Sequence, residues 1–468
     1  MPKPTTFFSC SRCDAQFPKW SGRCTECGAW GTVTENEGAM ASAGKQEVSA
    51  RPSVMTSLDS VAKESTKRLL SGITEFDAVL GGGFVPGSLT LLGGDPGVGK
   101  STLAAQVALF CAAQGTSVCY VSGEESASQV SDRMHRLGKT EKNLGFLAER
   151  DIDTILATIM KERPGVVILD SIQTLLSSSA NGEAGSVQQV RLVTNMVMQA
   201  AKSLNIPMMI IGHVTKDGAM AGPKSLEHLV DTVLYLEGDP MEDLRLLRSV
   251  KNRFGTTQTV GVVKFTETGF QPVEDASTVF LGKRQAAPGV MATVVLEGRR
   301  PFAVELQALT SPTSFGMPRR TASGTDPNRL HVLLAVLQRR AGLKTLGSQD
   351  VFVNVVGGLK AYDRGVDFAL CLAIVSSLDD REWPITWAAV GEVGLGGEIR
   401  LPQQLEARLR EAARAGFTDI LVPKLSKKPK ISGLRFHEVE RLSEGMQLIQ
   451  QAITRDGARP DSSSARPS

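Results

Sequence analysis

Residues 94–101 have the composition and spacing of a phosphate-binding loop. The string from Gly94 to Ser101 matches G-x-x-x-x-G-K-[ST]. Glycines let backbone N–H groups turn toward phosphate, Lys100 supplies a positive charge for the β- and γ-phosphates, and the Ser101 hydroxyl can ligate Mg²⁺. A purely structural glycine turn is the alternative. We expect ATP and Mg²⁺ to be held by Gly94, Asp95, Pro96, Gly97, Val98, Gly99, Lys100, Ser101 and Thr102.

Three polar residues that follow apolar strands are candidates for hydrolysis. Asp170 ends the run 166–169, where a carboxylate can hold Mg²⁺, although an Asp after a strand is often a helix cap. Glu124 and Glu125 follow a second strand, which we expect to lie next to the phosphate loop, and we assign Glu124 as the base that activates water. A solvated acidic turn is the alternative for both. His213 ends a third strand and could sense the γ-phosphate, unless it is only a satisfied polar residue.

Four cysteines before residue 30 form two C-x-x-C pairs, namely Cys10, Cys13, Cys24 and Cys27. Each pair presents two thiolates from a tight turn, which suits tetrahedral Zn²⁺ with no open position for a substrate. In so short a segment the metal replaces a hydrophobic core. The spacing therefore predicts a structural zinc ribbon rather than four unrelated cysteines.

The string Lys251-Asn252-Arg253-Phe254-Gly255 places two cations and an aromatic ring together. Apolar alternation predicts a β-hairpin with arms 244–250 and 260–266, so we expect this string on an exposed turn at its tip. Such a tip could enter a neighbouring subunit's nucleotide site or contact a DNA backbone. An inert charged surface loop is the alternative.

The elements that must position these residues alternate between strands and helices. Apolar strands are expected at 88–92, 118–122, 166–170 and 208–211, with helices after the phosphate loop, up to Gly138, and from about 186 to 204. Fully apolar strands separated by helices are typical of a parallel sheet covered on both faces. A hairpin at 291–296 and 303–309 then opens a second α/β region with helices near 330–337 and 368–377.

The length of the chain requires several domains. Its 468 residues include 52 Lys and Arg against 49 Asp and Glu, and a net charge of +3 restricts any nucleic-acid contact to local basic patches. No apolar run is long enough for a membrane span and no signal peptide begins the chain, so we expect a cytoplasmic protein. We expect a zinc ribbon at 1–34, a linker at 35–66, an ATPase domain at 67–272, a second α/β domain at 273–454 and a disordered tail at 455–468.

The zinc motif, the phosphate loop and the unchanged K-N-R-F-G string together resemble the bacterial RadA (Sms) family of DNA repair proteins. The resemblance covers nearly the whole chain and implies a RecA-like ATPase. It also implies a hexameric ring on single-stranded DNA that promotes branch migration of recombination intermediates, with a recombinase as a partner. In that family Lys100 is the nucleotide-site lysine, and Lys251 and Arg253 are needed for DNA-linked ATP hydrolysis.

The region from about 347 to 444 is similar to the peptidase domain of the Lon protease, which uses a Ser nucleophile and a Lys base. In our alignment Val366 stands at the serine and Glu406 at the lysine, so the fold is kept and proteolysis is lost. The basic residues Arg319, Arg320, Arg339 and Arg340 could line a DNA path or form a solvated face. An ATP-dependent protease and a zinc-ribbon adaptor that uses nucleotide as a switch are the alternative functions.

Overall fold

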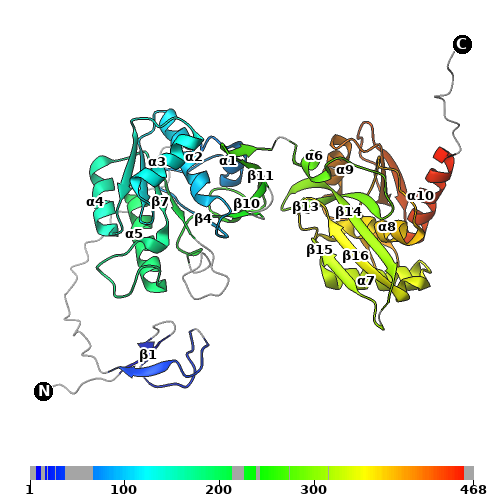
Figure 1. Ribbon diagram of the computed structural model, residues 1–468, viewed down its shortest axis with the longest axis horizontal. Helices are drawn as coiled ribbons and strands as arrows, with labels where there is room; N and C mark the ends of the chain where they lie inside the picture. Colours follow the sequence, from blue (N-terminus) through cyan, green and yellow to red (C-terminus); the bar gives the residue numbers. More distant parts are fainter. Residues whose placement is uncertain are drawn as a thin grey trace, which may run out of the picture.

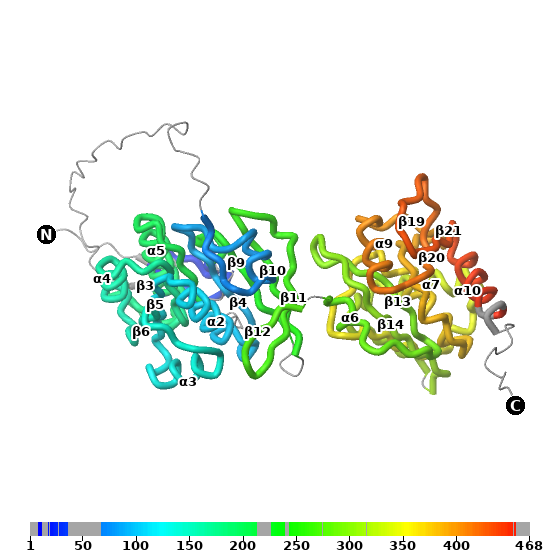
Figure 2. The backbone as a smooth tube through the Cα atoms, turned by 90° about the horizontal axis from the view of Figure 1, so that it is seen from above, coloured from blue at the N-terminus to red at the C-terminus, as the bar shows by residue number. Residues whose placement is uncertain are grey.

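The computed structural model describes residues 7–11, 16–17, 19–26, 28–36, 67–212, 226–238, 243–273, 275–314 and 316–457. In these ranges the strands form sheets of three, nine and seven strands and one two-stranded ribbon. Figures 1 and 2 show the nine-stranded and seven-stranded sheets side by side along the long axis of the molecule. Most of the predicted linker and tail, at 37–66 and 458–468, lies outside the described residues.

The N-terminal sheet has the order β2-β1-β3 and is antiparallel. Its strands are β1 (Phe7–Cys10), β2 (Gln16–Phe17) and β3 (Val33–Asn36), so β3 runs past the ribbon end expected at residue 34. The small core contains buried Cys10, Cys24 and Val33. A core of so few apolar side chains stabilises a fold only weakly, so the segment needs a further crosslink. A bound metal, as expected from the cysteine spacing, would supply one.

The nine-stranded sheet has the order β12-β11-β10-β9-β4-β8-β7-β5-β6. The six strands from β9 to β6 in this order run parallel to one another, and β10, β11 and β12 extend the sheet beyond β9 in antiparallel pairs. The bounds are β4 (Leu89–Gly94), β5 (Val118–Ser122), β6 (Leu144–Ala148), β7 (Val166–Asp170), β8 (Met208–Ile211), β9 (Thr232–Glu237), β10 (Leu244–Asn252), β11 (Val260–Thr266) and β12 (Gly269–Pro272). The four predicted apolar strands and the hairpin are therefore confirmed.

Helices cover both faces of this sheet, as its continuous apolar strands require. One face packs against α1 (Thr74–Leu80), α2 (Lys100–Ala113) and α3 (Ala127–Leu137), and the other against α4 (Ile152–Glu162) and α5 (Val187–Leu204). Helix α3 starts with a capping box in which Ser126 and Gln129 satisfy each other's backbone N–H groups, and it ends before Gly138 as predicted. Helix α5 is capped by Ser186, where the sequence placed its start.

The strand order corrects one expectation about the acidic pair. Strand β5, which precedes Glu124 and Glu125, does not lie beside the phosphate-loop strand β4, because β8 and β7 are inserted between them. The neighbours of β4 are β8 and β9, both parallel to it. Periodicity predicts strands but not their order, since each crossover can place its strand on either side of the growing sheet.

The seven-stranded sheet has the order β15-β16-β14-β13-β17-β20-β21 and mixes parallel with antiparallel pairs. Helices α7 and α8 pack on one face and α9 on the other. The bounds are β13 (Val290–Glu297), β14 (Arg300–Pro312), β15 (Arg320–Ser323), β16 (Gln349–Val355), β17 (Trp387–Ala389), β18 (Glu392–Val393), β19 (Ile399–Arg400), β20 (Asp419–Pro423), β21 (Arg435–Val439), α6 (Ala276–Leu281), α7 (Pro327–Arg340), α8 (Asp367–Asp379), α9 (Leu405–Arg414) and α10 (Leu442–Gly457). The predicted hairpin and two helices are present.

Candidate functional site

The loop between β4 and α2 can be built only with glycine at its key positions. Gly97 and Gly99 have φ of 77° and 106°, in the left-handed region. A Cβ atom on Gly94 would lie 2.4 Å from the Leu236 carbonyl oxygen, and one on Gly99 would lie 2.7 Å from Cζ of Phe270. The neighbouring strands β9 and β12 thus press against the loop, which starts at the carboxyl end of the buried strand β4.

The Lys100 side chain is buried at the start of α2 and turns back onto this loop. Its Nζ donates hydrogen bonds to the carbonyl oxygens of Gly94, at 3.0 Å, and Asp95, at 2.9 Å. Burial lowers the pKa of Lys100, while the charges of Asp170, Asp95 and Glu124 act in the opposite direction. A cation is therefore held among carboxylates at the place where the motif predicts contact with phosphate.

Asp170 ends β7 and is 6% exposed. Its Oδ2 accepts a 2.8 Å hydrogen bond from the Tyr120 hydroxyl, and the Ser101 hydroxyl is near enough to lower the pKa of the carboxylate. Burial is the main influence on the Asp170 carboxyl and raises its pKa, although these two hydroxyls lower it. Mg²⁺ prefers oxygen ligands such as a hydroxyl and a carboxylate, so Ser101 and Asp170 fit the expected role as its ligands.

The two glutamates after β5 point to different partners. Glu124 accepts a 2.5 Å hydrogen bond from the Ser171 hydroxyl, directly after Asp170, and its charge acts on Lys100. Glu125 instead forms an ion pair with Arg133 on α3. Of the two, Glu124 is the one whose charge acts on Lys100, and its assignment as the base stays a prediction.

Two residues of this cluster had no signal in the sequence. Tyr120 and Arg133 look like ordinary core and surface residues in their elements, and only the pairing of β5 with β7 brings Tyr120 to Asp170.

Beside the start of α2 lies an open cavity of about 540 Å³. Thr102, Arg133, Arg136, Lys264 and Phe265 are among the residues that line it.

The K-N-R-F-G string lies only in part on the expected turn, since Arg253, Phe254 and Gly255 follow the end of β10 and precede β11. Lys251 and Asn252 are the last residues of β10 and pair with β9, because the strand continues past the predicted end at residue 250. The Lys251 Nζ donates to the Glu227 carbonyl oxygen at 2.7 Å, and Asn252 donates to the carbonyls of Val79 and Leu80 at the end of α1. The sequence could not show these contacts, since their partners are remote in the chain.

Arg253 is also held within the subunit. Its Nη1 lies 3.0 Å from Oδ1 of Asp231, and Oδ2 of this buried carboxylate accepts the N–H of Leu89, the first residue of β4. The Arg253 side chain remains 53% exposed. The string therefore lies at the amino end of β4, whereas the phosphate loop begins at the carboxyl end, about 16 Å away for a strand of this length.

The described residues include only part of the predicted zinc set. Cys10 and Cys24 are fully buried in the N-terminal sheet, and the Cys10 Sγ lies 3.1 Å from the Thr32 hydroxyl. Cys13, Cys27 and the candidate nucleotide sensor His213 lie outside the described residues. Two buried thiols in a sheet with almost no core fit a structural Zn²⁺.

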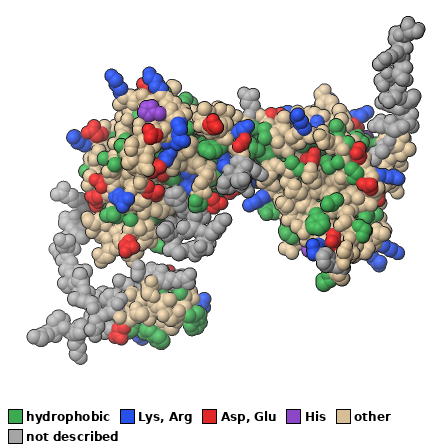
Figure 3. Space-filling model, in the orientation of Figure 1, with side chains coloured by type: hydrophobic (Ala, Val, Ile, Leu, Met, Phe, Trp, Pro, Cys, Tyr) green, Lys and Arg blue, Asp and Glu red, His purple; other side chains and the backbone are tan. Residues whose placement is uncertain are grey.

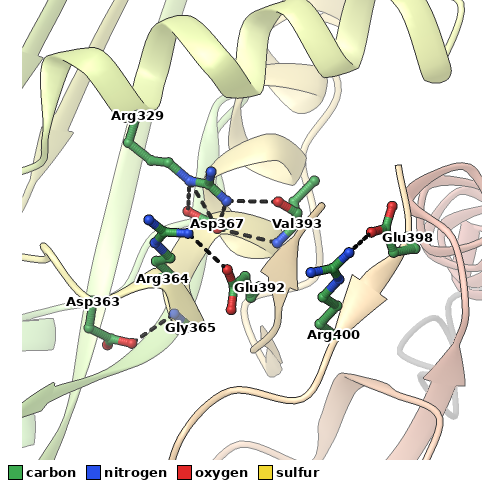
Figure 4. A network of polar contacts seen from close by, with 9 residues as sticks. All are labelled: Arg329, Asp363, Arg364, Gly365, Asp367, Glu392, Val393, Glu398 and Arg400. Carbon is green, nitrogen blue, oxygen red and sulfur yellow. Dashed lines mark hydrogen bonds and ion pairs between the residues drawn. The ribbon is translucent and has the colours of Figure 1, made fainter. Parts of the chain in front are cut away.

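The two positions aligned with the Lon nucleophile and base lie in different environments. Val366 is buried in the core, whereas Glu406 is 61% exposed and bonded to Arg410. The polar network near Val366 consists of other pairs (Figure 4): the Arg329 guanidinium contacts Asp367 and the Val393 carbonyl, and Arg364 lies 3.2 Å from Glu392. These groups satisfy one another, and none of them replaces the nucleophile.

A buried ion pair lies beside this network. Arg408 of α9 is 1% exposed and makes two hydrogen bonds to the Asp363 carboxylate, at 2.6 and 2.9 Å.

Four basic residues, Arg319, Arg320, Arg339 and Arg340, were candidates for a DNA path. Arg320 donates to the carbonyls of Gln349 and Leu346, and Arg340 donates to that of Leu395. Two of these four cations are thus committed to contacts within the chain.

Comparison with known proteins assigns the family. Residues 57–219 match the family described as AAA domain, and residues 8–35 match the family described as rubredoxin metal binding domain. The DNA repair protein RadA of Pseudomonas aeruginosa is 43% identical over 454 residues, which cover 96% of this chain and 100% of that protein. The chain belongs to the RadA family.

Other RadA relatives agree with this assignment. The RadA proteins of Synechocystis and Bacillus subtilis are each 44% identical and cover 91% and 90% of this chain, and 90% and 93% of their own lengths. The crystal structure of the RadB recombinase is 25% identical over 44% of this chain and 100% of its own, with a TM-score of 0.36. The two family matches give this RadA family member a zinc-ribbon segment and a RecA-like ATPase core, and that core implies ATP hydrolysis.

No helix in the described part of the chain combines the length and apolar character that crossing a membrane requires.

Proposed function

We propose that this chain is a DNA-dependent ATPase of homologous recombination and DNA repair. In this proposal it forms a hexameric ring on single-stranded DNA, promotes branch migration of recombination intermediates and cooperates with a recombinase. The phosphate loop would hold ATP, with Ser101 and Asp170 as Mg²⁺ ligands and Glu124 orienting the attacking water. When bound, Mg²⁺ would neutralise charge that develops on the phosphates. The zinc ribbon would be held by Cys10, Cys13, Cys24 and Cys27.

The observation that carries the proposal is the position of the segment 251–255 relative to the phosphate loop. The two lie at opposite ends of β4, so Arg253 and Lys251 cannot reach their own subunit's nucleotide. A ring with head-to-tail contacts presents such a segment to the next subunit or to DNA in its centre. Cations used in this way would link hydrolysis to the grip on DNA.

The first test is ATP turnover with and without single-stranded DNA. We expect DNA to stimulate the wild type severalfold and to leave Lys251→Ala unstimulated, while Lys161→Ala, an exposed lysine on α4, behaves as the wild type. Equal rates for all three proteins, with and without DNA, would contradict DNA coupling.

A mixing experiment tests whether Arg253 acts on a neighbour. If it does, Lys100→Ala and Arg253→Ala are each inactive, but a one-to-one mixture forms some interfaces with an intact lysine on one side and an intact arginine on the other. About a quarter of the interfaces in a random ring meet this condition. Recovery of activity on mixing supports action between subunits, and a mixture as inactive as its components contradicts it.

Branch migration is tested with a forked DNA substrate, with and without a recombinase. The proposal predicts ATP-dependent strand displacement. Slow hydrolysis with no displacement would favour the adaptor function instead. Casein degradation that depends on the C-terminal region would favour a protease, which buried Val366 and exposed Glu406 argue against.

A further inference from the structure

The zinc-ribbon segment exposes two large aromatic side chains. The chain has 4 tryptophans, and Trp20 and Trp30 are 62% and 75% exposed, whereas Trp383 and Trp387 are 3% and 8% exposed. The small core of the ribbon is made by other residues, so neither exposed ring fills the core. Hydrophobic side chains reach the surface of this segment with a basic side chain beside them in Figure 3. Exposed apolar surface that the core does not need can serve as a binding surface when its side chains lie together.

Trp20 is held with its polar edge turned inward. Its Nε1 donates to the Val33 carbonyl oxygen at 3.1 Å, and its Cη2 would lie 3.7 Å from a Cβ on Gly22. Because the indole N–H is already used, the exposed part of the ring offers an apolar π surface. Such a ring loses little conformational freedom when it stacks on a ligand.

Trp30 lies across the same short ladder. Trp30 pairs with Arg23 in an antiparallel bridge, and the Gly31 N–H donates to the Gly22 carbonyl oxygen at 2.9 Å. The Trp20 ring therefore lies over one residue of this ladder, and Trp30 is itself a member of the ladder. The bridge to Arg23 places Trp30, and the bond to the Val33 carbonyl places Trp20.

Cations accompany both rings. The Arg23 guanidinium carbon lies 5.8 Å from the Trp30 ring centroid, and its Nε is fixed by a 3.1 Å bond to the Gly28 carbonyl oxygen. Lys19 is exposed and directly precedes Trp20. A flat ring next to a cation suits a ligand with a flat apolar face and a nearby negative charge, which is the chemistry of a nucleotide in a single strand.

We propose that Trp20 and Trp30 form a stacking platform for the bases of single-stranded DNA, with Arg23 and Lys19 beside the phosphates. This inference rests on the proposed function and adds a second DNA contact, separate from the segment 251–255. A stable protein partner would need about 800 Å² on this side, much of the surface of so short a segment. Stacking needs only one ring for each base.

Intrinsic tryptophan fluorescence of the full chain tests the proposal. Since Trp383 and Trp387 are buried, quenching by a twenty-nucleotide oligo(dT) reports mainly on the ribbon. Anisotropy of a labelled oligo(dT) measures total binding in parallel. We expect clear quenching, binding about tenfold weaker in Trp30→Ala, and partial recovery in Trp30→Phe, because a smaller ring still stacks. Trp383→Phe, which leaves both exposed rings in place, is the fluorescence control.

The outcomes separate this inference from the proposed function. The platform is overturned if oligo(dT) binds without quenching and binds Trp20→Ala and Trp30→Ala as tightly as the wild type. The ATPase proposal then stays intact, and the two rings are available to a protein partner. No binding of oligo(dT) by the folded wild type overturns both. Zinc content and circular dichroism of each variant, matched to the wild type, show that a weaker interaction does not come from loss of the ribbon.

Discussion

Tyr120 donates its hydroxyl to Oδ2 of Asp170 over 2.8 Å, across the neighbouring parallel strands β5 and β7. Both side chains are buried, and burial together with the Asp170 charge raises the pKa of Tyr120 far above its ordinary value. The phenol therefore stays protonated and acts only as a donor. It fixes one carboxylate oxygen of the residue that we propose as a Mg²⁺ ligand.

Tyr120→Phe should raise the Mg²⁺ concentration that ATP hydrolysis requires without unfolding the protein. The change removes one hydrogen bond to a charged group, about 1.5 kcal/mol, so the Mg²⁺ concentration for half-maximal turnover should rise about tenfold. A Mg²⁺ titration of turnover measures this, and Tyr362→Phe at an exposed tyrosine is the control. An unchanged titration would show that Tyr120 serves packing alone.

Asp170→Asn should stabilise the fold while it abolishes Mg²⁺-dependent turnover. Burial raises the Asp170 pKa above the ordinary value of 3.8, so the folded chain holds this proton more tightly than the unfolded chain. The Asp170 carboxyl therefore contributes most to the free energy of unfolding below pH 3.8, where it is protonated in both states. This contribution is lost as the pH rises through the raised pKa of the folded state. At pH 7 the variant should gain about 1 kcal/mol.

Thermal unfolding of wild type and Asp170→Asn at several pH values tests this sign. The stabilisation should shrink toward acidic pH, where the wild-type carboxyl takes up its proton. Asp243→Asn, at a 70% exposed carboxyl, should show little gain at any pH. A variant that is less stable than the wild type at pH 7 would contradict a burial penalty at Asp170.

Glu124→Gln should remove hydrolysis and keep nucleotide binding. A general base contributes about 10²- to 10⁴-fold, and the amide cannot accept the proton from water. Glu125→Gln disturbs the ion pair with Arg133 instead and should keep most of the turnover. Single-turnover hydrolysis and binding of labelled ATP separate the two effects. The assignment is reversed if Glu125→Gln is the inactive variant.

The sequence predicted the phosphate loop and most elements because their signals are local. The G-x-x-x-x-G-K-[ST] spacing and the apolar runs of β4, β7 and β8 depend on residues close in the chain. Strand order and long-range partners are not encoded in this way. The insertion of β8 and β7 between β4 and β5 could not be predicted, nor could the contacts of Tyr120 with Asp170 and Arg253 with Asp231.

The K-N-R-F-G string shows how a local rule misplaces the end of a strand. Apolar alternation stops at Val250, so it predicts a strand end before Lys251. Pairing with β9 extends β10 through Asn252, and the Asn252 side chain binds carbonyls at the end of α1. A tertiary contact here overrides local propensity.

Arg408→Ala should destabilise the C-terminal sheet region strongly. The guanidinium is 1% exposed, and its removal leaves the 22% exposed Asp363 carboxylate with only the backbone N–H groups of Leu296 and Gly365, which should cost about 3 kcal/mol. Arg410→Ala on the same helix breaks only the exposed pair with Glu406 and should cost about 0.5 kcal/mol or less. Urea unfolding of both variants gives the comparison. Equal stability of the two would exclude a structural role for the buried pair.

Equilibrium binding of labelled ATP in the presence of Mg²⁺ tests the central claim most directly, namely that the loop 94–101 holds the triphosphate. We expect the wild type and Lys161→Ala to retain nucleotide equally. Lys100→Ala should bind about 100-fold more weakly, because one charge-assisted contact with phosphate is lost, about 3 kcal/mol. Failure of the folded wild type to bind, or equal binding by Lys100→Ala, would contradict the account.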